Sequence, residues 1–140
     1  MESDPELDNI HIVFVIAVIL ITGGWADAGL MSAEIFNPVT IASCSLPQLP
    51  EGRYGHSENE GLICGGTFDG DTQKTCVKWS PNSGTWKQSD NLRHRRAGHV
   101  SWVTASGVYL IGGSYSLLTS EKMKLDGSIE EGFGLKYETK

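Results

Sequence analysis

The sequence predicts an all-β fold assembled from repeated units. Two segments with the same order of residues support this prediction. Arg53-Tyr54-Gly55-His56 leads through an apolar run into Gly65-Gly66, and Arg96-Ala97-Gly98-His99 leads through another into Gly112-Gly113. The Arg/Gly/His segments lie 43 residues apart and the glycine pairs 47. A fixed period of this size is typical of repeat proteins, in which each unit buries its faces against its neighbours.

A third glycine pair extends the pattern toward the N-terminus. Gly23-Gly24 lies 42 residues before Gly65-Gly66 and closes the apolar run from Ile10 to Ile21. The segment after each pair ends in a dipeptide that favours a turn: Asn37-Pro38, Ser80-Pro81 and Asp126-Gly127. Because Pro and Gly set turn geometry, each segment is predicted to be a strand that the turn ends. The units cover about residues 10–52, 53–95 and 96–140.

The order of these features resembles the kelch repeat. In that repeat a double glycine ends the second strand, an aromatic residue lies in the third and a Trp opens the fourth. Trp79 and Trp86 follow Gly65-Gly66 in this order. The resemblance covers roughly residue 18 to the C-terminus. It implies an incomplete kelch-type β-propeller of two nearly full four-stranded blades plus a partial first blade, with almost no helix.

Two other repeat families fit less well, and the kelch interpretation itself leaves the ring incomplete. No Trp-Asp dipeptide of the WD40 type occurs, and the stretch from Ser80 to Trp86 departs from the sialidase Asp box. A closed propeller takes at least about four blades. We therefore expect a fragment of a longer propeller, in preference to a ring completed by several copies or an open stack with unpaired edges. Open blade edges would also allow self-association.

The N-terminal residues divide into two segments. Residues 1–9 carry four acids and no base, which predicts disorder. The run from Ile10 to Ile21 is shorter than the roughly 20 residues of a membrane span. It also lacks the basic start of a signal peptide. Its Val, Ile and Phe content favours a buried strand, with a signal or anchor segment as the alternative.

The second and third units differ in their inner strands. Residues 57–61, Ser-Glu-Asn-Glu-Gly, predict that the innermost strand of the second unit is short and polar or absent. The third unit has room for two apolar strands, Val100 to Thr104 and Val108 to Ile111. Its outer strands are predicted at Thr119 to Leu125 and at Gly132 to Tyr137, where apolar and polar residues alternate.

The charge of the chain argues against one class of partner. A net charge of −6 over 140 residues disfavours a nucleic-acid binder, because phosphate contacts require a basic face. One basic cluster is present, and its residues are expected on a solvated loop between two units in preference to an anion site: Lys87, Arg93, His94, Arg95 and Arg96.

The three cysteines are predicted to have different roles. Cys64 ends a second strand and Cys76 begins a third, so a hairpin would bring them to the separation of about 4.5 to 5.5 Å that suits a disulfide. A disulfide is favoured over two buried thiols, because a bond that closes the loop at this point also resembles a variant of extracellular kelch-like proteins. This favours an extracellular over a cytoplasmic location. Cys44 is expected to occupy the position of Trp86 in the next unit, with no partner in this chain.

The histidines and acids do not form a catalytic or metal site in the sequence. His56 and His99 recur at equivalent positions, which favours a structural role together with the repeated glycines, Arg53, Arg96 and Trp86. Asp69-Gly70-Asp71 lacks the further ligands of a calcium loop. We therefore expect no cofactor, no metal and no enzymatic activity. Galactose oxidase is a copper enzyme with a kelch propeller, but its set of Tyr, Cys and His residues cannot be assigned to positions in this sequence.

The loops after the glycine pairs are the expected binding surface. They would lie on one rim of consecutive blades, with the candidate residues Trp25, Asp27, Phe68, Asp69, Asp71 and Tyr115. The predicted function is a non-catalytic protein-interaction module, whose protein partner the sequence does not identify. The alternative is a fragment of a secreted propeller enzyme or carbohydrate-binding protein.

Overall fold

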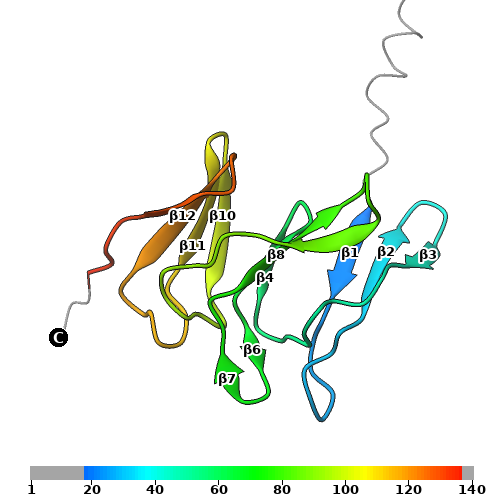
Figure 1. The fold of residues 1–140 in the computed structure, drawn as a ribbon, viewed down its shortest axis with the longest axis horizontal. Coiled ribbons are helices and arrows are strands. Elements are labelled where there is room, and N and C mark those ends of the chain that lie inside the picture. Colours follow the sequence, from blue (N-terminus) through cyan, green and yellow to red (C-terminus); the bar gives the residue numbers. More distant parts are fainter. Residues whose placement is uncertain (1–17, 137–140) are drawn as a thin grey trace, which may run out of the picture.

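The computed structural model describes residues 18–136, and this part of the chain is all-β (Figure 1). The predicted all-β class is therefore confirmed. Thirteen strands are present and none of the described residues is helical. Consequently, no described segment is a helix long and apolar enough to cross a membrane.

The strands form three antiparallel sheets that follow the three sequence units. The first sheet contains β1 (Ile19–Thr22), β2 (Ala33–Asn37) and β3 (Ala42–Ser45). The second contains β4 (Ser57–Asn59), β5 (Leu62–Cys64), β8 (Cys76–Ser80) and β9 (Thr85–Gln88). The third contains β10 (Val100–Thr104), β11 (Gly107–Ile111), β12 (Ser120–Lys124) and β13 (Ile129–Glu131). A small hairpin, β6 (Thr67–Phe68) and β7 (Asp71–Thr72), projects from the second unit.

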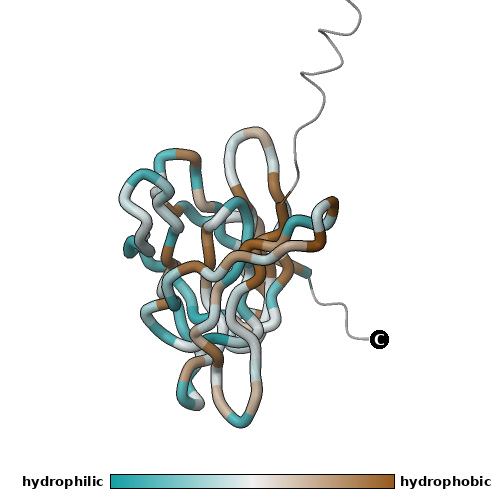
Figure 2. The backbone as a smooth tube through the Cα atoms, turned by 90° about the vertical axis from the view of Figure 1, so that its right-hand side faces the viewer, coloured by the Kyte–Doolittle hydropathy of each residue, from teal (hydrophilic) through white to brown (hydrophobic). Residues whose placement is uncertain are grey.

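In Figure 1 the three sheets lie side by side in chain order, from the first (blue to cyan) to the third (yellow to orange). Apolar segments cross the middle of the molecule, whereas many of the outer turns are hydrophilic (Figure 2). This distribution follows from the alternation of side chains along each strand, which gives every sheet two faces.

Two core clusters hold successive units together. Leu49, in the connector after β3, packs with Ile63, Val77 and the half-buried Trp86 of the second sheet. Leu92, in the connector after β9, belongs to the cluster between the second and third sheets. The other members of this cluster are Cys64, Cys76, Leu110 and Met123, with Leu62, Val108 and Ile129 against it. Both connector leucines lie four residues before a repeated arginine, a regularity that the sequence analysis did not identify.

The disulfide prediction is confirmed. Cys64 and Cys76 are directly paired in the β5–β8 ladder, and their sulfur atoms are bonded. Their Cα atoms are 4.2 Å apart. Gly65 donates its N–H to the carbonyl of Thr75, so the cysteines form the adjacent non-hydrogen-bonded pair, in which Cα atoms approach most closely.

The position assigned to Cys44 is wrong by one residue. Ser43 lies opposite Phe36, as Trp86 lies opposite Trp79, so Ser43 is the equivalent of Trp86. Cys44 pairs with Ile35 and is an exposed free thiol. The ladder register, which fixes which face a side chain occupies, cannot be read from the spacing of turns alone.

The predicted last strand from Gly132 to Tyr137 is also wrong. Asp126 accepts hydrogen bonds from the N–H and hydroxyl of Ser128 at 2.9 and 2.6 Å, which makes the turn after β12 tight. The chain therefore re-enters the sheet early, and Ile129 pairs with Met123. Residues 132–136 are not a strand, and Tyr137 lies outside the described residues.

The inner strands of the second and third units agree with expectation. β4 is three residues long and polar, and β10 and β11 form a five-residue pair. Of the N-terminal apolar run, only its end is described, as β1. Ile19 and Ile21 of β1 are 49% and 45% exposed, so this part is a strand but is not buried. The remainder of the run and the predicted disordered residues 1–9 lie outside the described residues.

Candidate functional site

The loops that follow the glycine pairs emerge at one edge of the three sheets, here called the rim (Figure 1, lower edge). All six paired glycines have a positive φ, between 61° and 111°. At Gly66 a Cβ would lie 2.9 Å from the carbonyl oxygen of Tyr54 and 3.0 Å from the Cβ of His56. Glycine is therefore required there both by backbone conformation and by space.

Each repeated arginine binds both ends of a rim loop. Arg53 is 1% exposed, and its Nη1 donates to the carbonyls of Gly65 and Thr75 at 3.0 and 2.9 Å, while Nη2 donates to Thr75 Oγ1. Arg96 makes the same three bonds to Gly112 and Thr119. The arginines thus close the base of the loops that carry the predicted binding residues. The expectation that Arg96 lies on a solvated loop is wrong, since Arg96 is buried, whereas the other four members of the basic cluster, Lys87, Arg93, His94 and Arg95, are exposed.

The two arginines differ in their charge partner. The Glu121 carboxylate accepts hydrogen bonds from Nε and Nη2 of Arg96 at 3.0 and 2.8 Å, and neither side chain is exposed. Glu121 also accepts the N–H groups of Arg93 and His94. At the equivalent position the second unit has Val77. Among residues 18–136, Arg53 Nε has no hydrogen-bond partner, and burial lowers the pKa of Arg53.

The repeated histidines connect neighbouring sheets. His56 Nε2 lies 3.1 Å from Thr22 Oγ1, and His99 Nε2 lies 2.8 Å from Ser57 Oγ. Burial, followed by the nearby Arg96 charge, lowers the pKa of His99 to about 4, and burial followed by Arg53 also lowers the pKa of His56. Both rings are thus neutral near pH 7. These contacts place the histidines between sheets, against the glycine pairs at which the rim loops begin.

The rim contains a hollow of about 350 Å³ between the first and second units. Residues from both units line it: Trp25, Asp27, Ala28, Gly29, Tyr54, Phe68, Asp69 and Gly70. Trp25 is 64% exposed and Phe68 36%. Asp27 and Asp69 lie at turns with φ of 61° and 48°, a conformation that Asp tolerates better than most residues. We call this site the rim hollow.

The structure brings four of the six predicted binding residues together and separates the other two. Trp25, Asp27, Phe68 and Asp69 line the rim hollow. Asp71 instead lines a neighbouring hollow of about 290 Å³ with Lys74 and Arg95. Tyr115 is 83% exposed and lines neither hollow.

Sequence reasoning missed Tyr54 as a lining residue. It occupies the variable position of the Arg-X-Gly-His segment, where the third unit has the small Ala97. Its backbone pairs with Thr67 at the start of the hairpin, which places the ring beside the loop. An aromatic residue at a variable position of an otherwise repeated segment was the available signal.

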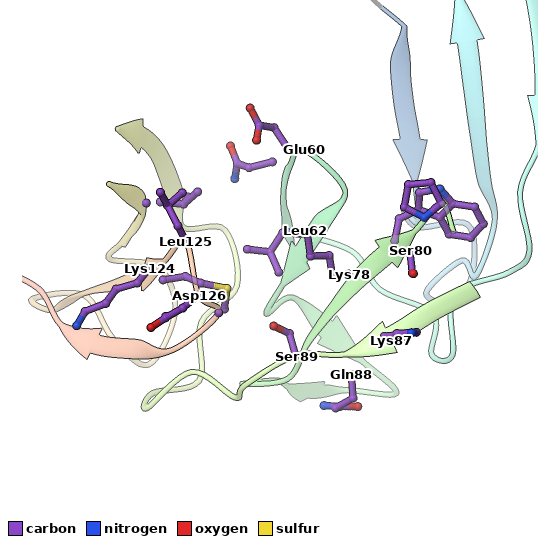
Figure 3. Close-up of a pocket in the computed structure, with 17 residues that line it drawn as sticks. Glu60, Leu62, Lys78, Ser80, Lys87, Gln88, Ser89, Lys124, Leu125 and Asp126 are labelled. Atoms are coloured by element: carbon purple, nitrogen blue, oxygen red, sulfur yellow. The ribbon is translucent and has the colours of Figure 1, made fainter. Parts of the chain in front are cut away.

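A larger hollow of about 440 Å³ lies near the opposite edge, between the second and third sheets (Figure 3). Its lining combines the strand ends and turns of β5, β8, β9, β11 and β12, including Leu62, Lys78 and Leu125. Leu62, Val108 and Met123 belong both to this lining and to the core cluster. The hollow is therefore the outer end of the packed interface between the second and third sheets. None of the predicted binding residues lines it.

The described residues contain no group of three His, Cys, Asp or Glu side chains arranged as metal ligands. Their fold is a series of consecutive antiparallel sheets, and their candidate site is an aromatic and acidic hollow on one edge. The chain is similar in structure to YjhT, with a TM-score of 0.68 and 15% sequence identity. The match covers 86% of this chain and 50% of the YjhT chain, so this chain spans about half of that length. At this identity the likeness shows the fold alone. No protein-family model and no curated protein matches the sequence.

Proposed function

We propose that the chain is a non-catalytic protein-interaction module built of kelch repeats and part of a longer propeller. The rim hollow is the observation that carries this proposal, because it joins loops of two consecutive units into one concave site. The repeated arginine contacts and the half-length likeness to YjhT support the repeat architecture.

The lining of the rim hollow favours a basic partner. Aromatic rings attract cations over their faces, and the hollow offers three of them, Trp25, Tyr54 and Phe68. The carboxylates of Asp27 and Asp69 supply opposite charge for a Lys or Arg side chain. The net charge of −6 would also steer a basic partner toward the chain. The binding target is therefore a protein segment with exposed Lys or Arg.

The proposal is tested with two model peptides of Gly and Ser that carry either two arginines or two glutamines at the same positions. The arginine peptide should quench or shift the fluorescence of the full chain, and the glutamine peptide should not. Asp27→Asn with Asp69→Asn, or Trp25→Ala alone, should weaken binding at least about tenfold, since aromatic and charged anchors dominate contact energies.

Two controls remove the same groups outside the rim hollow. Asp71→Asn with Asp126→Asn changes the net charge equally, and Tyr115→Ala removes an exposed ring from the third rim loop. Both should bind the arginine peptide as the unaltered chain does. Equal weakening by the control pair would show that only net charge matters, and the rim hollow would then be excluded as the binding site.

A fragment of a secreted carbohydrate-binding protein or propeller enzyme is the second candidate. The Cys64–Cys76 disulfide favours it, because disulfides persist mainly in oxidising, extracellular compartments. Binding of neutral oligosaccharides that depends on Trp25 but not on the aspartates, with no response to the arginine peptide, would select this candidate.

A further inference from the structure

In each of the first two units, the second glycine of the pair donates its N–H to the arginine carbonyl of the next unit, and the third unit has the same glycine. Gly24 donates its N–H to the carbonyl of Arg53 at 2.7 Å, and Gly66 donates to that of Arg96 at 2.8 Å. Gly113 is the third glycine in this series. Its N–H has no hydrogen-bond partner within residues 18–136.

The space beside this glycine pair is also open. A Cβ at Gly23 or Gly65 would lie 2.5 or 2.4 Å from the carbonyl oxygen of the next arginine, and 2.6 or 3.0 Å from the ring of the next histidine. At Gly112 the nearest described atom is the carbonyl oxygen of Leu117, at 3.5 Å. No described residue therefore fills, at the third sheet, the place that an arginine carbonyl and an imidazole fill at the first two.

The face of the third sheet next to this place carries exposed apolar side chains, with Lys122 over the Tyr109 ring and Phe133 packed against the same ring. Trp102 pairs with Tyr109, and their rings stack at 5.5 Å. Because side chains alternate, these two lie on the opposite face of the sheet from Leu110, which packs against the second sheet. Trp102 is 57% exposed and Val100 65%. The corresponding face of the second sheet, with Leu62 and Cys64, is covered by the third sheet.

The third unit also has a leucine at the position of the two connector leucines, Leu49 and Leu92. Leu49, Leu92 and Leu135 are spaced 43 residues apart. Each donates its N–H to a rim-loop carbonyl of its own unit, on Met31, Lys74 and Leu118, at 2.8, 2.7 and 2.8 Å. Leu49 and Leu92 are buried at 1% and 2% exposure, whereas Leu135 is half-buried. The position of Leu135 thus matches the two connector leucines, but this chain has Thr139 where they are followed by an arginine, so a docked unit would have to supply the arginine.

We infer that Gly113 and the face around Trp102 form a docking socket for a further repeat unit that opens with Arg-X-Gly-His. This deepens the proposed function by naming the surface that joins the module to the rest of a propeller, and it does not depend on what the rim hollow binds. The evidence is continuity with the interface between the second and third sheets.

A second copy of this chain fits the socket poorly. The segment before its first apolar run reads Asp8-Asn9-Ile10-His11, with neither arginine nor glycine at the required positions. Gly55 and Gly98 have φ of 67° and 64°, which the β-branched Ile10 would adopt only with strain. The socket therefore selects a unit with the complete segment.

The test replaces Thr139 and Lys140 by a second copy of residues 96–140, joined directly after Glu138. The appended arginine then follows Leu135 by four residues, as Arg53 follows Leu49. Hydrogen exchange of the Gly113 amide should slow at least about tenfold relative to the unextended chain. The matched control carries Gly98→Ile in the appended copy only, and Gly113 should then exchange as in the unextended chain. An appended unit that stays unfolded, or that leaves Gly113 exchange unchanged, overturns the inference.

The unextended chain provides an independent check. Trp102→Ser should lower its free energy of unfolding by less than about 1.5 kcal/mol, a shift of less than about 13-fold in the unfolding equilibrium, because the main contact it removes is the stack on Tyr109. Sedimentation should show a monomer whose mass does not depend on concentration. A large loss of stability, or a dimer that Trp102→Ser dissociates, would show that another part or copy of this chain already occupies the face.

Discussion

Arg96 and Glu121 form an ion pair from which solvent is fully excluded, 25 residues apart in the chain and with an N–O distance of 2.8 Å. Removal of one partner from such a pair leaves the other charge buried and uncompensated. We expect Glu121→Gln to lower the free energy of unfolding by about 3–5 kcal/mol in urea denaturation. The exposed pair of Arg93 with Glu131 provides the control, and Glu131→Gln should cost less than about 1 kcal/mol. Equal effects of the two substitutions would contradict this ranking.

The two repeated arginines should respond differently to lysine. Lysine cannot reproduce the planar set of donors that reaches two carbonyls and a hydroxyl, so both Arg53→Lys and Arg96→Lys should destabilise the chain. Arg96→Lys should destabilise more, because Arg96 also donates two bonds to Glu121, whereas the carboxylate nearest to Arg53 is that of Glu51, at 3.9 Å. Chemical denaturation of both variants measures the difference, and the reverse order would disprove the asymmetry.

Stability should fall as the pH falls from about 6.5 to about 4. His99 has a pKa of about 4 in the folded chain against 6.5 as its ordinary value, so the unfolded chain takes up the proton first. Each such histidine can cost up to about 1.4 kcal/mol per pH unit within this window, and His56 adds to the slope because its pKa is also lowered. His99→Gln should flatten the pH dependence of the unfolding midpoint, and an unchanged slope in this variant would contradict the assignment.

Reduction of the disulfide should weaken the chain by roughly 3 kcal/mol on the chain-entropy estimate, given the separation of 12 residues between Cys64 and Cys76. Cys64→Ser with Cys76→Ser should show the same loss without reductant. Cys44→Ser should have little effect, because that thiol is exposed and free. Peptide mapping under non-reducing conditions checks the pairing, and recovery of Cys64 and Cys76 as separate alkylated thiols would refute it.

Two glycines with similar backbone angles should tolerate alanine differently. Gly66 and Gly84 have φ of 91° and 65°, but only Gly66 has backbone atoms within about 3 Å of an added Cβ. Gly84→Ala should cost about 1 kcal/mol for the left-handed conformation alone. Gly66→Ala should cost clearly more, since Tyr54 and His56 must also move. Thermal unfolding of the pair separates the two contributions.

The sequence was sufficient for features that depend on local pattern. The glycine pairs, the hairpin from Cys64 to Cys76 and the short polar strand β4 all follow from turn residues and alternation. Features that depend on contacts between distant residues were not accessible. Nothing near Arg96 in the sequence indicates Glu121, and Arg96 reads as solvated because it follows three other basic or titratable residues.

The candidate site shows the same division. The rim position of the loops follows from the glycine period, but their grouping depends on the course of each loop in space. The hairpin of β6 and β7 turns Phe68 and Asp69 toward Trp25 and leaves Asp71 beside Lys74. Tyr115 lies in a loop whose own bonds, from Ser116 to Gly113 and Arg95, keep it apart.

The buried arginines have a consequence for how such a chain can diversify. The Arg53 side chain donates hydrogen bonds to Gly65 and Thr75, the two ends of the segment that contains β6 and β7. Thr67, Gln73 and Lys74 also bond to the scaffold through backbone groups, which leaves the tip between them free to vary in length or composition. New specificities could arise by exchange of residues 68–72 while the sheets keep their sequence.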